Sequence, residues 1–229
     1  MQAPTKVAVF GKAVEVIKPL IAKHGFTVVS EHPELVFSYG GDGALMQAEH
    51  AYPGIPKMPL RHSRVCKVCP PFDNETVLKK IKAGKYRLVK HHKLQVNASG
   101  EQLIALNDIV VHNYDPRHAI RYHLVINGAQ IGEEIIGDGF VVATPFGATG
   151  YYRSITDSIF EVGLGVAFNN STEPSDHLVV AENSLITTTI RRGPAIIYAD
   201  NQAKLITVSA GEQATIRKSD LSAQMVKLD

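Results

Sequence analysis

The segment Gly40-Gly41-Asp42-Gly43 contains one acidic residue in a loop otherwise made of glycine. The glycines allow the backbone to approach a phosphate closely, and the amides at the start of a helix attract anions. A carboxylate beside a phosphate either holds a metal or accepts a proton from an attacking hydroxyl, as in phosphoryl transfer. The other interpretation is a tight turn in which Asp42 caps the following helix. This segment alone does not decide between the two interpretations.

Two further segments favour a nucleotide ligand. Leu106-Asn107-Asp108 ends an expected strand with an amide beside a carboxylate, which suits an adenine edge and a ribose diol, although an isolated dipeptide of this kind is usually a turn. Residues 137–151 are typical of a strand that leads into a Pro/Gly turn and a helix start. Such a helix start is a nucleotide-binding geometry. Its candidate ligand contacts are Thr149, Tyr151 and Ser154.

In this order and at these separations, the three segments resemble the NAD kinase family. Its hallmarks are a Gly-Gly-Asp-Gly loop, an Asn-Glu pair after a strand, and an Asp-Gly strand leading into Thr-Pro-x-Gly-x-Thr-Ala-Tyr. The likeness extends to Asn127-Gly128 and, more weakly, to Asp200-Asn201-Gln202, and covers roughly residues 35–218. Diacylglycerol kinases, sphingosine kinases and phosphofructokinases share the Gly-Gly-Asp-Gly loop, so the combination with the Thr-Pro segment carries the family assignment.

The resemblance implies phosphoryl transfer from ATP, or polyphosphate, to the adenosine ribose 2′-hydroxyl of NAD, giving NADP. It implies a divalent cation, Mg²⁺, that accompanies ATP, no metal site made by the protein, and a homodimer or homotetramer. The implied fold is an α/β N-terminal domain with a parallel sheet followed by an all-β C-terminal domain. The implied roles are Asp42 as catalytic base, Gly41 and Gly43 in the phosphate loop, Asn107 and Asp108 on adenine and ribose, Thr149 and Tyr151 against adenine, and Asp138 and Ser154 completing the dinucleotide pocket.

The chain departs from the family pattern at several places. Ala44 stands where a Thr or Ser is usual, and Asp108 replaces Glu. The second Gly-rich strand and loop is represented only by residues 53–61, and a Gly-Gly-Pro segment is replaced by residues 155–158. Two other functions therefore stay open, a related kinase acting on another hydroxyl and a nucleotide-binding protein that has lost catalysis. The retained Asp42 favours catalysis.

The two cysteines lie together in Cys66-Lys67-Val68-Cys69, with His62 four residues upstream. A structural zinc site needs four ligands, and only these three are close in sequence. A redox pair favours a helix start, which Pro70-Pro71 opposes. Two plain thiols are the favoured interpretation, with zinc and redox chemistry as alternatives, and a double Cys→Ser variant is then expected to keep its activity.

Composition narrows the class of protein. The 229 residues, 45% of them hydrophobic, make one large domain or two small ones that can fold without a disulfide or metal. A net charge of +2 is too small to indicate a nucleic-acid partner. No apolar run reaches the roughly 18 residues of a membrane span, and the N-terminal residues do not form an apolar leader. We expect a soluble, cytoplasmic protein without a membrane partner.

The expected secondary structure changes near residue 85. Before it, strands alternate with helices, which predicts a parallel α/β arrangement. After it, apolar residues recur with period two, which predicts an all-β region. The expected domains are residues 1–85 and 86–229, with the boundary between residues 84 and 90 and with a return of the C-terminal segment to the first domain left open. The strands expected before the change are 7–10, 26–29 and 35–37, and the helices there begin near 14, 44 and 75. One helix, 149–160, interrupts the β region. The strands expected in the β region are 94–96, 104–106, 122–126, 131–136, 140–143, 184–190, 195–198, 205–209 and 214–218.

Overall fold

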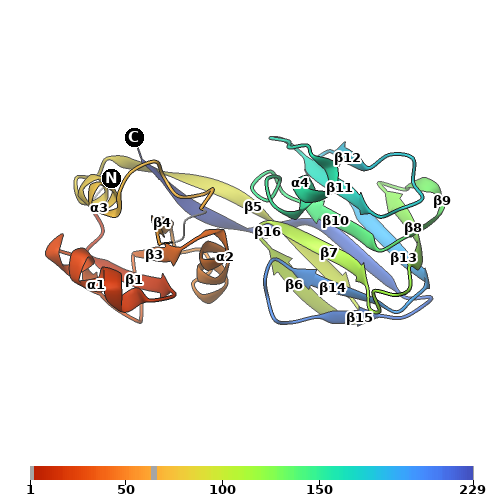
Figure 1. Cartoon of the computed structure of the whole chain (residues 1–229), viewed down its shortest axis with the longest axis horizontal. Helices are drawn as coiled ribbons and strands as arrows, with labels where there is room; N and C mark the ends of the chain where they lie inside the picture. Colours follow the sequence, from red (N-terminus) through yellow and green to blue (C-terminus); the bar gives the residue numbers. More distant parts are fainter. Residues whose placement is uncertain (1–2, 63–65, 229) are drawn as a thin grey trace. The chain divides into compact units, whose positions relative to one another are not determined.

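The computed structural model describes residues 3–62 and 66–228 and divides the chain into two compact units (Figure 1). Unit 1 comprises the described residues up to His91 together with those from Ser222 onward, and unit 2 comprises His92–Leu221. The chain therefore passes between the units twice, once within strand β5 (Tyr86–Ala98) and once within strand β16 (Gln213–Leu228).

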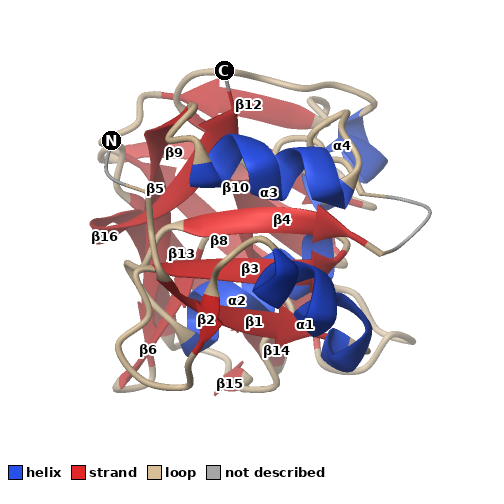
Figure 2. Cartoon of the chain, turned by 90° about the vertical axis from the view of Figure 1, so that its left-hand side faces the viewer, coloured by secondary structure: helices blue, strands red, loops and turns tan. Residues whose placement is uncertain are grey.

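Unit 1 contains a sheet in the order β2-β1-β3-β4, whose neighbouring strands all run parallel. The last part of β16 also pairs with β4, with Met225 opposite Lys57. Figure 2 shows β1, β3 and β4 side by side, with helices α1 and α3 in front of them. The elements are β1 (Lys6–Gly11), α1 (Val14–Lys23), β2 (Thr27–Val28), β3 (Leu35–Gly40), α2 (Asp42–Ala51), β4 (Lys57–Arg61) and α3 (Asn74–Lys82).

Alternating side chains on the strands of unit 1 separate two apolar layers. Phe37 of β3 belongs to the cluster that contains Ile21 of α1 and Leu78 of α3. Val36, its neighbour, packs instead with Ala48 of α2. Because successive residues of a strand point to opposite faces, α1 and α3 cover one face and α2 covers the other. The α/β prediction for this half is confirmed.

Strand β4 was not among the predicted strands, because its residues were interpreted only as the remnant of a glycine-rich strand and loop. Pro59 lies inside this strand opposite Ser38 of β3. Lys57 is fully buried and forms an ion pair with Glu49 of α2, which ties the strand to the helix. Pro19 lies inside α1 without ending the helix.

Unit 2 is an all-β sandwich, which confirms the prediction for this half. One sheet has the antiparallel order β12-β11-β10-β7-β14-β15, and the other contains β5, β6, β8, β9, β13 and β16. Phe140 from the first sheet and Tyr122 from the second are fully buried in a shared core. The remaining strands are β6 (Glu101–Ala105), β7 (Asp108–Asn113), β8 (Ile120–Ile126), β9 (Ala129–Gly137), β10 (Gly139–Ala143), β11 (Leu164–Asn169), β12 (His177–Val180), β13 (Ile186–Arg192), β14 (Ala195–Ala199) and β15 (Ile206–Val208).

Helix α4 (Tyr151–Thr156) packs on the outer face of the six-stranded sheet, where Tyr152 contacts Val110, Val141 and Ala167. It is shorter at both ends than the helix 149–160 expected from the sequence. Strands β7, β11 and β12 were also not anticipated. Among the described residues, no helix has both the length and the apolar character needed to cross a membrane.

Candidate functional site

The Gly-rich loop of unit 1 lies at the carboxyl edge of the parallel sheet. Strand β3 ends at Gly40, Gly41 is extended, and α2 begins at Asp42. Gly40 lies opposite Arg61 of β4, and the His62 amide donates to the Gly40 carbonyl oxygen at 3.3 Å. Ligands of open parallel sheets bind at this edge, so Asp42 occupies a position where a carboxylate can reach one.

Close packing explains two small residues of this edge. Gly11 at the end of β1 has φ +138°, and a β-carbon there would lie 2.1 Å from the Tyr39 carbonyl oxygen. A β-carbon at Gly40 would lie 2.8 Å from the Ala44 β-carbon. Ala44, one of the departures from the family pattern, therefore packs directly against the loop.

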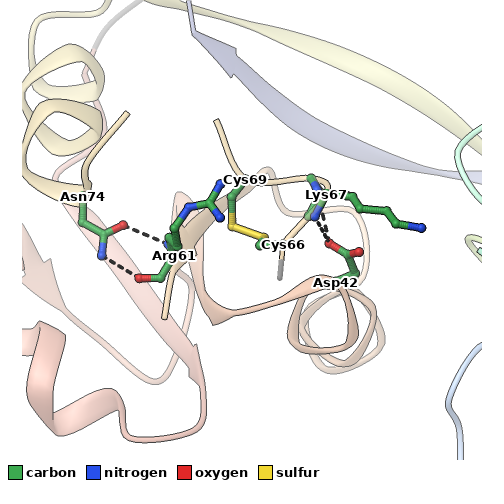
Figure 3. The surroundings of a disulfide bond; sticks show 7 residues. Asp42, Arg61, Cys66, Lys67, Cys69 and Asn74 are labelled. Carbon is green, nitrogen blue, oxygen red and sulfur yellow. Dashed lines mark hydrogen bonds between the residues drawn. A yellow bond between two sulfur atoms is a disulfide. The ribbon is translucent and has the colours of Figure 1, made fainter. Parts of the chain in front are cut away.

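The Asp42 carboxylate accepts two backbone hydrogen bonds from the cysteine loop (Figure 3). The Lys67 amide donates to Asp42 Oδ1 at 2.9 Å, and the Val68 amide donates to the same oxygen at 3.2 Å. Both amides lie between Cys66 and Cys69, which are joined by a disulfide.

The interpretation of Cys66 and Cys69 as plain thiols was wrong. The residues between them form a turn that brings the two Cα atoms to 5.4 Å, a separation that suits a disulfide. Pro70-Pro71 prevents a helix start but does not prevent this turn. Because each sulfur is bonded to the other, neither is available as a thiolate ligand for zinc.

His62, considered from the sequence only as a third zinc ligand, has another partner. Its Nδ1 lies 3.0 Å from the Tyr39 hydroxyl, and the two ring centroids are 4.6 Å apart. Nearby, the Asn74 side chain accepts from the Arg61 amide and donates to the Arg61 carbonyl, both at 2.9 Å (Figure 3). These contacts fix the chain where it leaves β4.

In unit 2, Asn107 lies in the turn between β6 and β7, and Asp108 is the first residue of β7. Asp200 holds this turn. The Asp200 carboxylate accepts from the amides of Leu106 at 2.8 Å, Asn107 at 2.7 Å and Asp108 at 3.2 Å. Asp200 belongs to the Asp-Asn-Gln segment, whose weak family resemblance was the only sequence signal for it. Its side chain holds the backbone of the turn in place.

The segment beginning at Thr144 packs onto the same turn. The Thr144 amide donates to the Asn107 carbonyl at 2.8 Å, and the Thr144 hydroxyl donates to the Leu106 carbonyl at 2.7 Å. A β-carbon at Gly147 would lie 2.3 Å from the backbone carbonyl oxygen of Asn107, so only glycine fits there. A β-carbon at Gly150 would lie 3.8 Å from Asp108 Oδ2 and 3.9 Å from Asn107 Nδ2. Two of the three sequence motifs therefore converge in unit 2.

Burial raises the pKa values of the ionisable side chains around this turn. Asp108 is 7% exposed, and desolvation together with the charge of Asp200 raises its pKa to about 7. Burial also raises the pKa of Asp200. Burial, followed by the proximity of Tyr151 and Asp108, raises the pKa of Tyr198 to about 12. Tyr198 is thus a neighbour of the site that sequence reasoning missed.

Asn107 retains an unused acceptor. Its Oδ1 is buried and has no hydrogen-bond partner among the described residues. A buried polar atom without a partner is unfavourable unless a ligand or water completes it. This side chain is therefore suited to accept a hydrogen bond from a ligand.

Asp138 and Tyr151 are flanked by asparagines that sequence reasoning missed. Asp138 accepts from Asn113 Nδ2 at 3.2 Å and from Asn170 Nδ2 at 2.8 Å. Asn169 Nδ2 donates to the Tyr151 hydroxyl at 3.4 Å. Burial, and then the charges of Asp138 and Asp108, raise the pKa of Tyr151.

Thr149 lies just before α4, and Ser154 lies within it. Thr149 is half-buried. Ser154 is exposed and donates its hydroxyl proton to the Tyr151 carbonyl at 2.7 Å, so only its lone pairs remain for a ligand.

Known proteins resemble this chain in sequence. The family described as ATP-NAD kinase C-terminal domain matches residues 106–228. An NAD kinase of Saccharophagus degradans is 30% identical over 207 residues, which cover 82% of this chain and 69% of that protein. An NAD kinase of Acinetobacter baylyi is 29% identical over 207 residues, which cover 84% of this chain and 67% of that protein.

Two solved structures share the fold. Yeast NADH kinase, complexed with NADH, has a TM-score of 0.85 at 15% identity and covers 99% of this chain and 84% of its own. An NAD kinase from Archaeoglobus fulgidus, in complex with ATP, has a TM-score of 0.78 at 23% identity, with 98% and 94% covered. At these identities the structural likeness establishes the arrangement of the elements.

Proposed function

Because this chain belongs to the NAD kinase family, we propose that it transfers a phosphoryl group from ATP to the adenosine ribose 2′-hydroxyl of NAD and releases NADP. The observation that carries the proposal is the position of Asp42, whose carboxylate lies in a glycine loop at the carboxyl edge of the parallel sheet. ATP as the donor is supported by the family's description and by the ATP complex of the Archaeoglobus relative. Polyphosphate is the alternative donor.

Asp42 acts as general base in this proposal. As the ribose oxygen attacks the terminal phosphorus, the bond from phosphorus to the ADP oxygen breaks and the hydroxyl proton passes to the carboxylate. The Lys67 and Val68 amides both contact Oδ1, and in this proposal Oδ2 takes the proton. Gly41 and Gly43 give the donor phosphates access to the backbone. Mg²⁺ enters with ATP as part of the substrate and neutralises phosphate charge.

Unit 2 supplies dinucleotide recognition in this proposal. The Asn107 amide reads an adenine edge through its unpaired Oδ1, and Asp108 binds a ribose hydroxyl. Thr149 and Tyr151 pack against adenine. Asp138, held by two asparagines, completes the pocket together with Ser154.

Location and assembly are further proposals. The family resemblance supports a cytoplasmic enzyme that forms a homodimer or a homotetramer. Sedimentation equilibrium of the purified protein tests the assembly, since a monomer at micromolar concentration would contradict it.

The activity is tested by incubating the protein with NAD, ATP and Mg²⁺ and measuring NADP with an NADP-specific dehydrogenase. Parallel reactions replace ATP by polyphosphate, or NAD by NADH. We expect NADP to form with ATP. Formation only with polyphosphate would correct the donor. Absence of NADP with either donor would contradict the proposal, and ATP turnover with another alcohol would then favour a related kinase.

A further inference from the structure

We propose that the Cys66–Cys69 loop is a redox-dependent clamp that positions Asp42 when the disulfide is formed and releases it when the disulfide is reduced. The role of Asp42 as base comes from the proposed function. The observations behind the clamp are the two hydrogen bonds between the loop and the carboxylate and the disulfide that closes the loop. In this scheme Lys67 and Val68 are positioning residues that act through their backbone amides.

Two neighbouring amides of the loop converge on one oxygen of Asp42. Their distances to Oδ1 are 2.9 Å from Lys67 and 3.2 Å from Val68. Hydrogen bonds to an ionised carboxylate are stronger than those between neutral groups. Because both donors come from one short loop, they restrict the rotation of the carboxylate as well as its position (Figure 3).

The disulfide closes a stretch of described residues that form no helix or strand. Strand β4 ends at Arg61 and α3 begins at Asn74, and the described residues between them form neither helix nor strand. Asn74 fixes the Arg61 end of this connection through two hydrogen bonds. Cys66 and Cys69 are only 8% and 9% exposed, so the sulfur pair is packed inward while the Lys67 side chain is exposed.

Reduction would remove the covalent tie between positions 66 and 69. A dithiol reductant attacks one sulfur as a thiolate, the bond between Cys66 and Cys69 breaks, and a mixed disulfide forms. The second thiol of the reductant then displaces the protein sulfur. Two electrons and two protons are transferred, which leaves two protein thiols and a cyclic disulfide of the reductant. Without the tie, the backbone regains its freedom and the two amides leave Oδ1.

The first test compares oxidised and dithiothreitol-reduced wild-type protein in the NADP-forming assay. Thiol titration should find none of the two cysteines free before reduction and both free afterwards. We expect kcat to fall about 10-fold on reduction because the base is no longer held in place, with the KM for NAD changed by less than about 2-fold. Removal of the reductant and reoxidation should restore kcat. An unchanged or increased kcat would overturn the clamp.

The Cys66→Ser/Cys69→Ser variant controls for direct effects of the reductant. It should have the kcat of the reduced wild type and should not respond to dithiothreitol. This expectation is opposite to that for two plain thiols. A variant with the kcat of the oxidised wild type would show that the disulfide does not position Asp42.

Amide hydrogen exchange tests the clamp without using activity. In the oxidised protein, the Lys67 and Val68 amides should exchange at least about 10-fold more slowly than after reduction. Asp42→Ala removes the acceptor and should accelerate both amides even with the disulfide intact. Equal exchange in all three samples would overturn the contacts, and slower exchange without a change in kcat would overturn their role in the reaction.

These readouts separate the clamp from the proposed function. If the oxidised protein forms no NADP, the kinase assignment fails while the exchange experiment still decides whether the loop holds Asp42. If the oxidised protein is active and reduction changes neither kcat nor exchange, the kinase assignment stands and the clamp fails.

Discussion

Asp42 in unit 1 and Asp200 in unit 2 both accept hydrogen bonds from consecutive backbone amides. In unit 1 the amides position the carboxylate, whereas in unit 2 the carboxylate positions the amides. Asp42 is the proposed reacting group, and the Lys67 and Val68 amides hold it. Asp200 has a structural role, because it fixes the backbone that carries the proposed ligand contacts Asn107 and Asp108.

The two arrangements are also sensitive to different chemistry. The amides around Asp42 come from a loop closed by a disulfide, and a reductant can break this bond. The amides around Asp200 depend on a carboxylate whose pKa is raised by burial, which a proton can neutralise. Similar hydrogen-bond geometry therefore gives one site that responds to redox conditions and another that responds to pH.

Asp42→Asn tests the claim that Asp42 reacts, and it should have the largest effect. Asparagine keeps an oxygen for the Lys67 and Val68 amides but cannot accept the hydroxyl proton. We expect kcat to fall by at least ~10²-fold, with NAD affinity by calorimetry near that of wild type. Unchanged turnover would contradict the role of general base.

Asp200→Asn tests the claim that the Asp200 carboxylate fixes the backbone of residues 106–108. An amide nitrogen in place of one carboxylate oxygen leaves a backbone amide of residues 106–108 without its acceptor. The free energy of unfolding, measured in urea, should fall by about 2–3 kcal/mol, and NAD affinity should fall with it.

The matched control for Asp200→Asn is Asp115→Asn, which removes surface ion pairs of the half-buried Asp115 with the exposed Arg117 and His118. Such pairs contribute at most about 1 kcal/mol. Equal effects of the two substitutions would show that the amides of residues 106–108 do not depend on Asp200.

Asn107→Ala sharpens the assignment of ligand recognition to unit 2. The substitution removes the buried Oδ1 that is proposed to accept from the ligand. Calorimetry should show NAD binding weakened by ~1–3 kcal/mol. Asn97→Ala, in an exposed hairpin, is the control and should leave affinity unchanged. Unaltered affinity in Asn107→Ala would place adenine elsewhere.

Asp108→Asn tests the response of unit 2 to pH, with the smallest expected effect. The pKa of Asp108 rises from 3.8 to about 7 on folding, so the folded wild type retains a proton that the unfolded chain releases within this range. Wild-type stability should therefore fall relative to the variant by about 1–2 kcal/mol between pH 6 and pH 7.5, as urea unfolding would show. A constant difference across this range would contradict the raised pKa.

Much of the fold could be predicted from apolar periodicity, which located most strands and the change from α/β to all-β structure. The exceptions have local causes. Strand β4 contains Pro59, and a proline normally argues against a strand inside a sheet. The single strand β16 extends through Lys218 to Leu228, although the pattern indicated only a short run.

The candidate site could be predicted where residue type carries chemistry, as for Asp42 in its glycine loop and for Asn107-Asp108. Backbone amides carry no such signal, because every residue except proline has one. Nothing at Lys67 or Val68 therefore indicated a hydrogen bond to a residue 25 or 26 positions earlier. The spacing of Cys66 and Cys69 did allow a disulfide, but the neighbouring prolines directed the interpretation elsewhere.

The passage of the chain through β16 has a consequence for the order of folding during synthesis. Unit 1 needs the residues from Ser222 onward, since Met225 pairs with β4 and Val226 belongs to the core of α1, α3 and β3. These residues leave the ribosome only after all of unit 2, whereas domains commonly fold in N-terminal to C-terminal order. The sandwich can therefore be complete while the unit that begins the chain still lacks a strand.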